Sequence, residues 1–332
     1  MDILVLGGTG FLSSAVVAEL QQAEHRVTIL TRGRRPVPQG VAAITADRHD
    51  LPRLLQELEG RPFDAVVDCI CFTAEDAQAD LRAFAGRVGH FFMISTDFVY
   101  GRHRVLPADE DTPPLALNGY GRQKGEAEAV LQQAWREEGF PVTILRAPHI
   151  MGAGGHLGTG SLQGRDPALL DRLEQGAPII LIDGGQLLIQ PVVHRDVGRA
   201  VAAALGKEPT LGQAYNVAGP DCVTTRAYYD LVAATLGIEE VDYLSLPAPL
   251  YVQSAPEKAP FTLHRMYSVD KLERDTGYRP DTTLQHAVFE TVDWLQEHDA
   301  AAPYEESARD RETAALCRAF EHSLVDVLRE TC

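Results

Sequence analysis

The sequence predicts an α/β protein in which a doubly wound parallel sheet is followed by a smaller α/β region. Three observations lead to this prediction. Short apolar runs alternate with helical patterns over the first 150 residues, a glycine-rich turn directly follows the first run, and the alternation ends in a glycine-rich stretch from Gly152 to Gly160. Strands that alternate with helices form a parallel sheet, because each connecting helix crosses over one of its faces.

The elements follow one another in a regular order. Apolar runs predict six strands, at Ile3–Leu6, Val27–Leu30, Ala42–Thr45, Ala65–Val67, His90–Ser95 and Val142–Arg146. Apolar residues at helical spacing predict helices over residues 11–20, 51–58, 75–86 and 119–137. Gly139 and Pro141 end the last of these helices, since neither residue continues a helix well.

Composition and charge argue against several classes of protein. The 332 residues carry 30 Lys and Arg against 47 Asp and Glu, a net charge of −17, whereas nucleic-acid binders rely on clustered cations. Five scattered cysteines, with the close pair spaced C-x-C, indicate neither a disulfide framework nor a zinc site. The chain has no basic signal segment and no run of about 20 apolar residues. We therefore expect a cytoplasmic protein with no metal, membrane or nucleic-acid partner.

The glycine-rich turn predicts a dinucleotide site. Residues 7–13 read GGTGFLS, directly after the first strand and at the start of the first helix. Glycine at position 7 permits a tight turn, and glycine at position 10 lets the backbone approach a pyrophosphate at the helix N-terminus. The context favours a Rossmann domain with contacts from Gly7, Thr9, Gly10, Phe11 and Leu12, the alternative being a turn without a ligand. Ser13 stands where a third glycine is expected.

The next strand indicates which nicotinamide cofactor fits. Its end lacks a carboxylate and reads Thr31, Arg32, Gly33, Arg34, Arg35. Positive charge there suits the 2′-phosphate of NADP and makes Thr31, Arg32 and Arg35 candidate contacts. NAD is the alternative, with the arginines forming a solvated turn. Asp47, after the third strand, is placed to accept a hydrogen bond from the adenine amino group, and Cys69 lies near the expected cofactor path.

A tyrosine and a lysine on the long helix carry the predicted chemistry. Tyr120 and Lys124 are four residues apart and therefore share a helix face, although such a spacing also occurs in surface pairs. A neighbouring ammonium stabilises a phenolate and so lets a tyrosine act as a base near neutral pH. Ser95 and Thr96 end a strand at the carboxyl edge of the sheet, where ligands bind in such folds.

These segments together resemble the extended short-chain dehydrogenase/reductase superfamily, and within it the NAD-dependent epimerase/dehydratase family. The resemblance covers about residues 1–298 and rests on the turn at 7–13, Asp47, ISTDFVYG (94–101), YGRQK (120–124), LRAPHIMG (145–152), PVVHRDV (191–197) and the segment 276–295. It implies that Thr96 would hydrogen-bond the reacting oxygen and that Tyr120 would be the acid/base. Lys124 would bind the nicotinamide ribose and lower the pKa of Tyr120.

Departures from that resemblance narrow the predicted function. Sugar-nucleotide 4,6-dehydratases place Glu where this chain has Phe98, although Asp97 remains. In sugar-nucleotide members of the family, an arginine that binds the diphosphate stands where this chain has Ile189. Many of those members also have an asparagine near the position of His149. We therefore favour a reductase or an epimerase over a 4,6-dehydratase. Asp97, Phe98 and His149 are candidate substrate contacts, and His149 is equally well explained as a structural histidine.

The resulting hypothesis is an NAD(P)-dependent oxidoreductase that transfers hydride between nicotinamide and the hydroxyl or ketone carbon of a small substrate, for example a sugar or sugar nucleotide. The alternative is a non-catalytic NAD(P)-binding scaffold, or an RNA-binding relative, against which the charge of −17 argues. Proteins that this chain resembles often pair through the helix that bears Tyr120, so we expect a homodimer.

The expected domains follow from these assignments. The Rossmann domain would comprise residues 1–150 and parts of 190–220, and the substrate-binding region 151–189 and 221–298. A helical extension would occupy residues 299–332. Its apolar residues at helical spacing form a stripe of Leu316, Phe320, Leu324, Val327 and Leu328. Such a stripe indicates that the helix docks on the chain's own body or forms a dimer contact.

Overall fold

The computed structural model describes residues 1–103, 105–159 and 165–331, without the side chains of residues 324, 326–328, 330 and 331. The chain divides into two compact units. Unit 1 comprises residues 1–150, 190–220 and 266–282, and unit 2 comprises residues 151–189, 221–265 and 283–332. Residues 266–282, which we expected in the substrate-binding region, belong to unit 1, because Leu272 packs into the core beneath its sheet.

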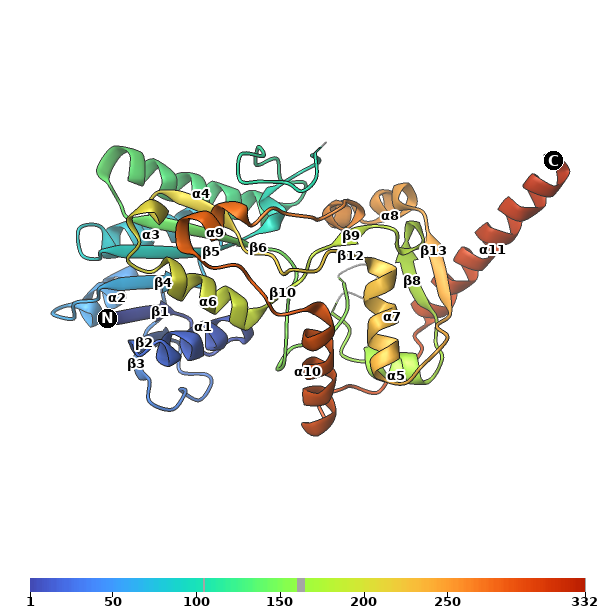
Figure 1. The fold of residues 1–332 in the computed structure, drawn as a ribbon, viewed down its shortest axis with the longest axis horizontal. Coiled ribbons are helices and arrows are strands. Elements are labelled where there is room, and N and C mark those ends of the chain that lie inside the picture. The colour runs from blue at the N-terminus through green and yellow to red at the C-terminus, as the bar shows by residue number, and fades with distance from the viewer. Residues whose placement is uncertain (104, 160–164, 332) are drawn as a thin grey trace. The chain divides into compact units, whose positions relative to one another are not determined.

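The predicted doubly wound parallel sheet is confirmed (Figure 1). Its strands are β1 (Asp2–Leu6), β2 (Arg26–Thr31), β3 (Ala42–Thr45), β4 (Ala65–Asp68), β5 (His90–Thr96), β6 (Val142–Ala147) and β11 (Gln213–Asn216). They lie in the order β11-β6-β5-β4-β1-β2-β3, and their pairings are parallel. The carboxyl ends of β1, β4, β5 and β6 therefore meet at one edge of the sheet.

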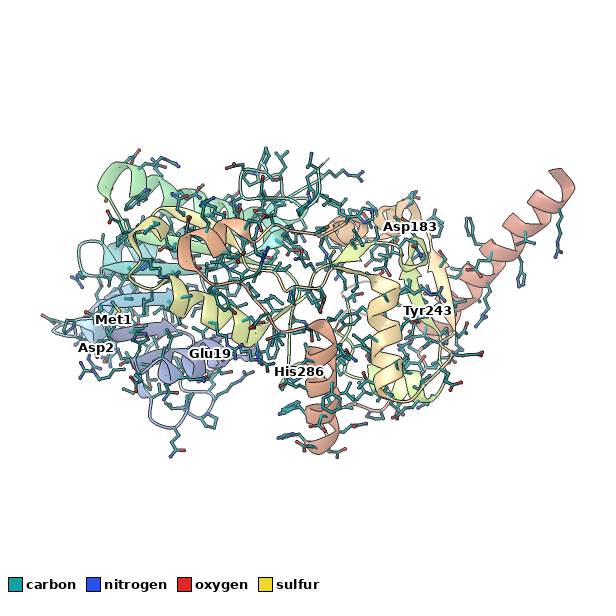
Figure 2. The ribbon with its side chains drawn as sticks, viewed as in Figure 1. Met1, Asp2, Glu19, Asp183, Tyr243 and His286 are labelled. Carbon is teal, nitrogen blue, oxygen red and sulfur yellow. The ribbon has the colours of Figure 1, made fainter. Side chains whose placement is uncertain are left out.

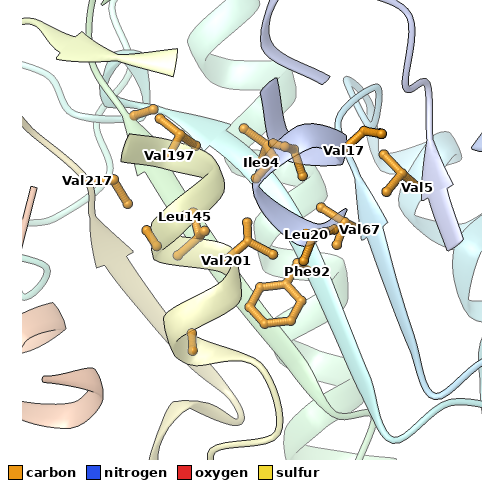
Figure 3. Packing of buried hydrophobic residues seen from close by; sticks show 14 of the residues in the cluster. Val5, Val17, Leu20, Val67, Phe92, Ile94, Leu145, Val197, Val201 and Val217 are labelled. Atoms are coloured by element: carbon orange, nitrogen blue, oxygen red, sulfur yellow. The ribbon is translucent and has the colours of Figure 1, made fainter. Parts of the chain in front are cut away.

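Helices cover both faces of this sheet. On one face lie α1 (Phe11–Gln22) and α6 (His194–Ala204), and Figure 3 shows their apolar side chains against the strands: Val17, Leu20, Val197 and Val201 with Val67, Phe92 and Leu145. On the other face lie α2 (Leu51–Leu58), α3 (Ala74–Phe84) and α4 (Gly119–Glu138). Glu19 of α1, labelled in Figure 2, pairs with Arg199 of α6 at 3.3 Å. A further helix of unit 1 is α9 (Asp270–Thr276).

Unit 2 contains short strands and helices. Strand β8 (Ile179–Ile182) pairs in parallel with β13 (Tyr243–Leu246), and β9 (Leu188–Ile189) pairs antiparallel with β12 (Val223–Thr224). Its helices are α5 (Leu169–Glu174), α7 (Thr225–Thr235), α8 (Ala248–Ser254), α10 (Leu284–Glu297) and α11 (Ala308–Thr331). Of the remaining short strands, β10 (Val192–Val193) belongs to unit 1, and β7 (Ile150–Met151) lies at the boundary between the two units in the sequence. No helix within the described ranges is long and apolar enough to cross a membrane.

The C-terminal helix α11 docks on unit 2 of the chain itself, one of the two expected alternatives, through residues other than Leu316 and Phe320 of the predicted stripe. Ala314 and Cys317 are buried against Ile180 and Leu244, because small residues let the helix approach the β8–β13 pair. Leu316 and Phe320 of the stripe are 69% and 46% exposed. The side chains of the other stripe residues, Leu324, Val327 and Leu328, lie outside the described set.

A buried histidine anchors the start of β5. His90 is 1% exposed, and its Nδ1 accepts a hydrogen bond from the Gly206 N–H at 3.0 Å. Nε2 therefore carries the proton and donates to Thr143 Oγ1 at 2.7 Å, while the Thr143 hydroxyl donates to the Thr210 carbonyl at 2.6 Å. Burial lowers the pKa of His90 to about 4, so the ring is neutral at pH 7.

We predict that His90 makes the fold sensitive to acid. In the unfolded chain a histidine titrates near 6.5, so between about pH 6.5 and 4 the unfolded state binds a proton that the native state excludes. The histidine should therefore remove about 2 kcal/mol of stability on going from pH 7 to pH 5. Urea unfolding at both pH values, for the unmodified chain and for His90→Asn, measures this difference. An equal loss of stability in both proteins would contradict the prediction.

Candidate active site

The glycine-rich turn joins β1 to α1 in a conformation that requires glycine. Gly7 and Gly8 have φ values of +109° and +90°. A Cβ on Gly8 would lie 2.3 Å from Cγ2 of Ile29, so no larger residue fits there. Sequence reasoning missed Gly8, because the contact comes from β2. The turn leaves the positive end of α1 facing the adjoining groove.

Ser13, at the position of the expected third glycine, has a defined role in this turn. Its hydroxyl accepts a hydrogen bond from the Gly10 N–H at 3.0 Å. Gly10 is the residue that precedes α1, so the serine satisfies a backbone donor that the helix itself cannot pair.

A groove of about 470 Å³ lies at this turn in unit 1. Seven of the predicted cofactor contacts line it: Gly7, Thr9, Gly10, Thr31, Arg32, Arg35 and Asp47. Arg34, part of the positive segment that suggested NADP, also lines it, as do Arg48 and His49, which sequence reasoning had not assigned to the cofactor. Asp47 is the one carboxylate among these described lining residues. The donor set therefore fits an anionic dinucleotide, since both the cations and the helix N-terminus attract phosphate.

Contacts within the groove fix two of these residues. Arg35 Nη1 donates to the Thr9 carbonyl at 3.0 Å, which links the loop after β2 to the glycine-rich turn. Asp47 Oδ1 accepts the His49 N–H at 3.0 Å, and this hydrogen bond lowers the pKa of the carboxyl group. Asp47 is therefore ionised at neutral pH and able to accept hydrogen bonds.

A buried arginine holds the wall of the groove. Arg48 is 5% exposed, and it donates to Asp68 Oδ2 at 2.6 Å and to Asp80 Oδ1 at 3.0 Å. It thereby joins the segment after β3 to the end of β4 and to α3. Asp68, Cys71 and Asp80 lie close enough together to hold a metal ion. The guanidinium donates to both carboxylates, so the ion pairs themselves account for this acidic cluster.

The predicted pair on α4 divides between surface and interior. Asn118 Oδ1 accepts the Gly121 N–H at 2.8 Å and caps the helix, which begins just before Tyr120. Tyr120 is 43% exposed, whereas Lys124, one turn later, is 2% exposed. The Lys124 ammonium donates to the Cys71 carbonyl at 2.6 Å and to the Ile94 carbonyl at 2.8 Å. Burial lowers the pKa of this ammonium below its ordinary value.

Two phenylalanines flank the tyrosine. The ring centroid of Tyr120 lies 6.5 Å from that of Phe72 and 6.2 Å from that of Phe98, the latter in an edge-to-face arrangement. Phe72 also lines the groove and covers the ammonium, with Lys124 Nζ 4.6 Å from its ring centroid. Sequence reasoning missed Phe72. The available signal was an aromatic residue just beyond the carboxyl end of the fourth strand, near Cys69.

The end of β5 brings together three candidate residues. Thr96 Oγ1 donates to Asp97 Oδ1 at 3.2 Å and accepts the Phe98 N–H at 3.3 Å. Asp97 is 4% exposed, and Tyr267 donates its hydroxyl hydrogen to Asp97 Oδ2 at 3.0 Å. The carboxylate is therefore held inside unit 1. His149, partly buried between β6 and β7, accepts the Val192 N–H on its carbonyl at 3.0 Å.

Other predicted cofactor contacts lie away from the described lining of the groove. Leu12 packs against the core on the α1 face of the sheet, and the Phe11 ring lies 4.8 Å from that of His194. Cys69 is likewise not among the lining residues, and burial raises the pKa of its thiol, which keeps the thiol neutral. Tyr120 and Lys124 are not among the lining residues either, but both lie against Phe72, which lines the groove.

A buried ion pair fixes the helix behind the lysine. Glu128, one turn beyond Lys124, accepts the Ser95 hydroxyl at 2.5 Å and the Arg146 Nη2 at 2.6 Å. Arg146 Nη1 donates in turn to the Tyr100 hydroxyl at 2.9 Å. The pair therefore connects α4 to β5 and β6, next to Thr96. The sequence signal for Glu128 was its spacing of four residues from Lys124, on the same face.

Comparison with known proteins assigns the chain to a family. The sequence model of the NAD-dependent epimerase/dehydratase family matches residues 3–218. A 2′-dehydrokanamycin reductase from Streptomyces kanamyceticus is 29% identical over 250 residues, which cover 75% of this chain and 70% of that protein. The chloroplast stem-loop binding protein of 41 kDa b from Arabidopsis thaliana is 25% identical over 300 residues, covering 85% of this chain and 76% of that protein.

Solved structures agree in fold. A UDP-glucose 4-epimerase from Thermotoga maritima, solved with UDP-glucose, has a TM-score of 0.72 and 20% identity, covering 90% of this chain and 99% of its own. A dTDP-glucose 4,6-dehydratase from Streptomyces venezuelae, solved with NAD, has a TM-score of 0.74 and 22% identity, covering 90% and 97%. With the family match over most of the sheet and the glycine-rich turn in place, the chain belongs to the NAD-dependent epimerase/dehydratase family and is a nicotinamide-dependent enzyme of that family.

Proposed function

We propose that this protein is an NADP-dependent oxidoreductase that interconverts a hydroxyl group and a ketone on a small sugar-like substrate, with net reduction as its reaction. The observation that carries the proposal is the Tyr120–Lys124 pair, in which a buried ammonium lies one helical turn from an exposed phenol. The relative that is named a reductase spans three quarters of the chain and favours reduction over epimerisation.

Three side chains supply the proton chemistry in this proposal. Tyr120 donates the proton to the reacting oxygen during reduction and takes it back in the reverse direction. The Lys124 charge stabilises the resulting phenolate, and its anchoring on two carbonyls keeps it within one helical turn of the phenol. Thr96 orients the reacting oxygen through its hydroxyl. When bound, the nicotinamide supplies or accepts the hydride.

The groove residues hold the cofactor. The backbone at Gly7, Thr9 and Gly10 would receive the pyrophosphate at the N-terminus of α1. Arg32 and Arg35, beside Thr31, would bind the 2′-phosphate, which is why we propose NADP rather than NAD. The ionised carboxylate of Asp47 would accept the adenine amino group.

Epimerisation is the second candidate. UDP-arabinose 4-epimerase 1 from Arabidopsis thaliana is 25% identical over 181 residues, which cover 46% of this chain and 43% of that protein. Two positions narrow the candidate substrate and reaction. Ile189, which is 1% exposed, stands where the family resemblance implies an arginine that binds a diphosphate, so it argues against a sugar nucleotide. Phe98 provides no carboxylate and argues against a 4,6-dehydratase. A reductase must release its cofactor in each cycle, whereas an epimerase retains it.

Two finer expectations remain proposals. A homodimer rests on the resemblance of α4 to a common dimer surface, and size-exclusion chromatography with light scattering tests it. A cytoplasmic location rests on the scattered, unpaired pattern of the cysteines. Fractionation of the source cells tests it.

We predict that Tyr120→Phe lowers turnover by about 100-fold or more, because the phenyl ring cannot exchange the proton of the reacting oxygen. NADPH binding, followed by fluorescence, should stay within about twofold of the unmodified protein, since the groove residues are intact. A panel of ketones and sugar nucleotides, monitored by the absorbance of reduced nicotinamide, provides the assay. Unchanged turnover in Tyr120→Phe would favour the non-catalytic scaffold instead.

We also predict that replacing Arg32 and Arg35 together by serine weakens NADPH binding about tenfold to 100-fold, the effect of losing charge-assisted contacts to a phosphate. NADH binding should change by less than about threefold, because NADH lacks the 2′-phosphate. Titration calorimetry with both cofactors measures the two affinities. Arg87→Ser, an exposed arginine outside the described groove lining, is the matched control. Equal losses for both cofactors would contradict a role in NADP recognition.

A further inference from the structure

Phe72 lies beside the dinucleotide groove, Tyr120 and Lys124, which are the three parts of the candidate site in unit 1. Its side chain lines the dinucleotide groove, its ring centroid lies 6.5 Å from that of Tyr120, and Lys124 Nζ lies 4.6 Å from its ring centroid. Phe72 is 44% exposed, which is high for a phenylalanine in a folded domain.

The ring covers an ammonium whose other contacts are backbone carbonyls. Lys124 Nζ donates to the carbonyls of Cys71 and Ile94 and is close to the face of Phe72. Lys124 is nevertheless 2% exposed, although Tyr120 one turn earlier is 43% exposed. Phe72 therefore both covers the buried cation and lines the groove. An aromatic ring suits this place, because it attracts a cation while it excludes water.

The backbone beneath the ring is fixed at the N-terminus of α3. Asp76 Oδ2 accepts the N–H groups of Phe72 and Thr73, at 2.8 Å and 3.0 Å. Thr73 Oγ1 accepts the Asp76 N–H at 3.2 Å and completes a reciprocal cap. Cys71, whose carbonyl holds the ammonium, directly precedes Phe72. The ring and one of the lysine's anchors are thus positioned by the same helix cap.

We propose that Phe72 is a positioning residue of this enzyme: its ring seals Lys124 from water and keeps the ammonium on its two carbonyl anchors, beside Tyr120. The proposal rests on the proposed function for its catalytic consequence. Charge interactions are stronger where water is excluded, so a sealed ammonium stabilises the neighbouring phenolate more than a hydrated one. Removing the ring admits water and weakens that interaction.

The lysine composition of the chain allows a direct test. The four lysines are Lys124, Lys207, Lys258 and Lys271, so each can be followed separately by peptide mass spectrometry. A short pulse of acetic anhydride labels amines in proportion to their accessibility. We expect Lys124 in Phe72→Ala to react about five to ten times faster than in the unmodified protein, relative to the exposed Lys258, because the cation–π cover is lost. Phe72→Leu, which keeps an apolar cover, should lie between the two.

Controls separate local sealing from general loosening. Phe289→Ala removes an exposed phenylalanine from α10 in unit 2 and should leave Lys124 labelling unchanged. Unchanged Lys124 labelling in Phe72→Ala would overturn the proposal. So would an equal rise at the half-buried Lys271, because it would mean that the whole unit had opened.

Turnover completes the test. In Phe72→Ala we expect kcat to fall about tenfold. In Phe72→Leu we expect kcat to recover in part, because the leucine side chain restores an apolar cover over Lys124. Unchanged kcat despite faster Lys124 labelling would overturn the positioning role. The labelling experiment needs no substrate, so its result does not depend on the proposed function. If Tyr120→Phe leaves turnover intact while Phe72→Ala exposes Lys124 to labelling, the proposed function is wrong, but Phe72 still shields Lys124 from water.

Discussion

The Lys124 ammonium is held by the carbonyls of Cys71 and Ile94, and the rest of the candidate site depends on that anchoring. One carbonyl belongs to the loop after β4 and the other to β5, so the lysine fastens α4 to the carboxyl edge of the sheet. A buried ammonium needs such acceptors, because desolvation without them costs several kcal/mol. The exposed tyrosine one turn earlier thereby acquires a fixed position relative to the cation.

Local charge at the site opposes the charge of the whole chain. The net charge is −17, yet arginines and a helix N-terminus line the groove beside the glycine-rich turn. Arg48, which lines the groove, is held by Asp68 and Asp80, whereas the Arg146–Glu128 pair fixes α4 against β6. Such pairs contribute modest net stability but fix geometry, because removing one partner leaves an uncompensated buried charge. The groove can thus attract phosphate in an acidic protein.

Features set by local spacing could be predicted from the sequence. These features include the strands, the glycine-rich turn and the shared helix face of Tyr120 and Lys124. Each depends on residues that are close together in the sequence. Contacts made across the fold could not. Gly8 is required because Ile29 of β2 approaches it, and Phe72 gains its place only when α4 packs beside α3. The buried face of α11 at Ala314 and Cys317 depends likewise on β8 and β13, so it could not be predicted from the helix alone.

The central claim is that Lys124 makes Tyr120 acidic, and titration of the phenolate tests it most directly. Phenolate absorbance is recorded against pH for the NADP-loaded protein, and subtraction of Tyr120→Phe isolates this residue from the other tyrosines. The account predicts a midpoint below the ordinary value of a tyrosine near 10, and its return toward that value in Lys124→Met. A midpoint that is the same with and without the lysine would contradict the account.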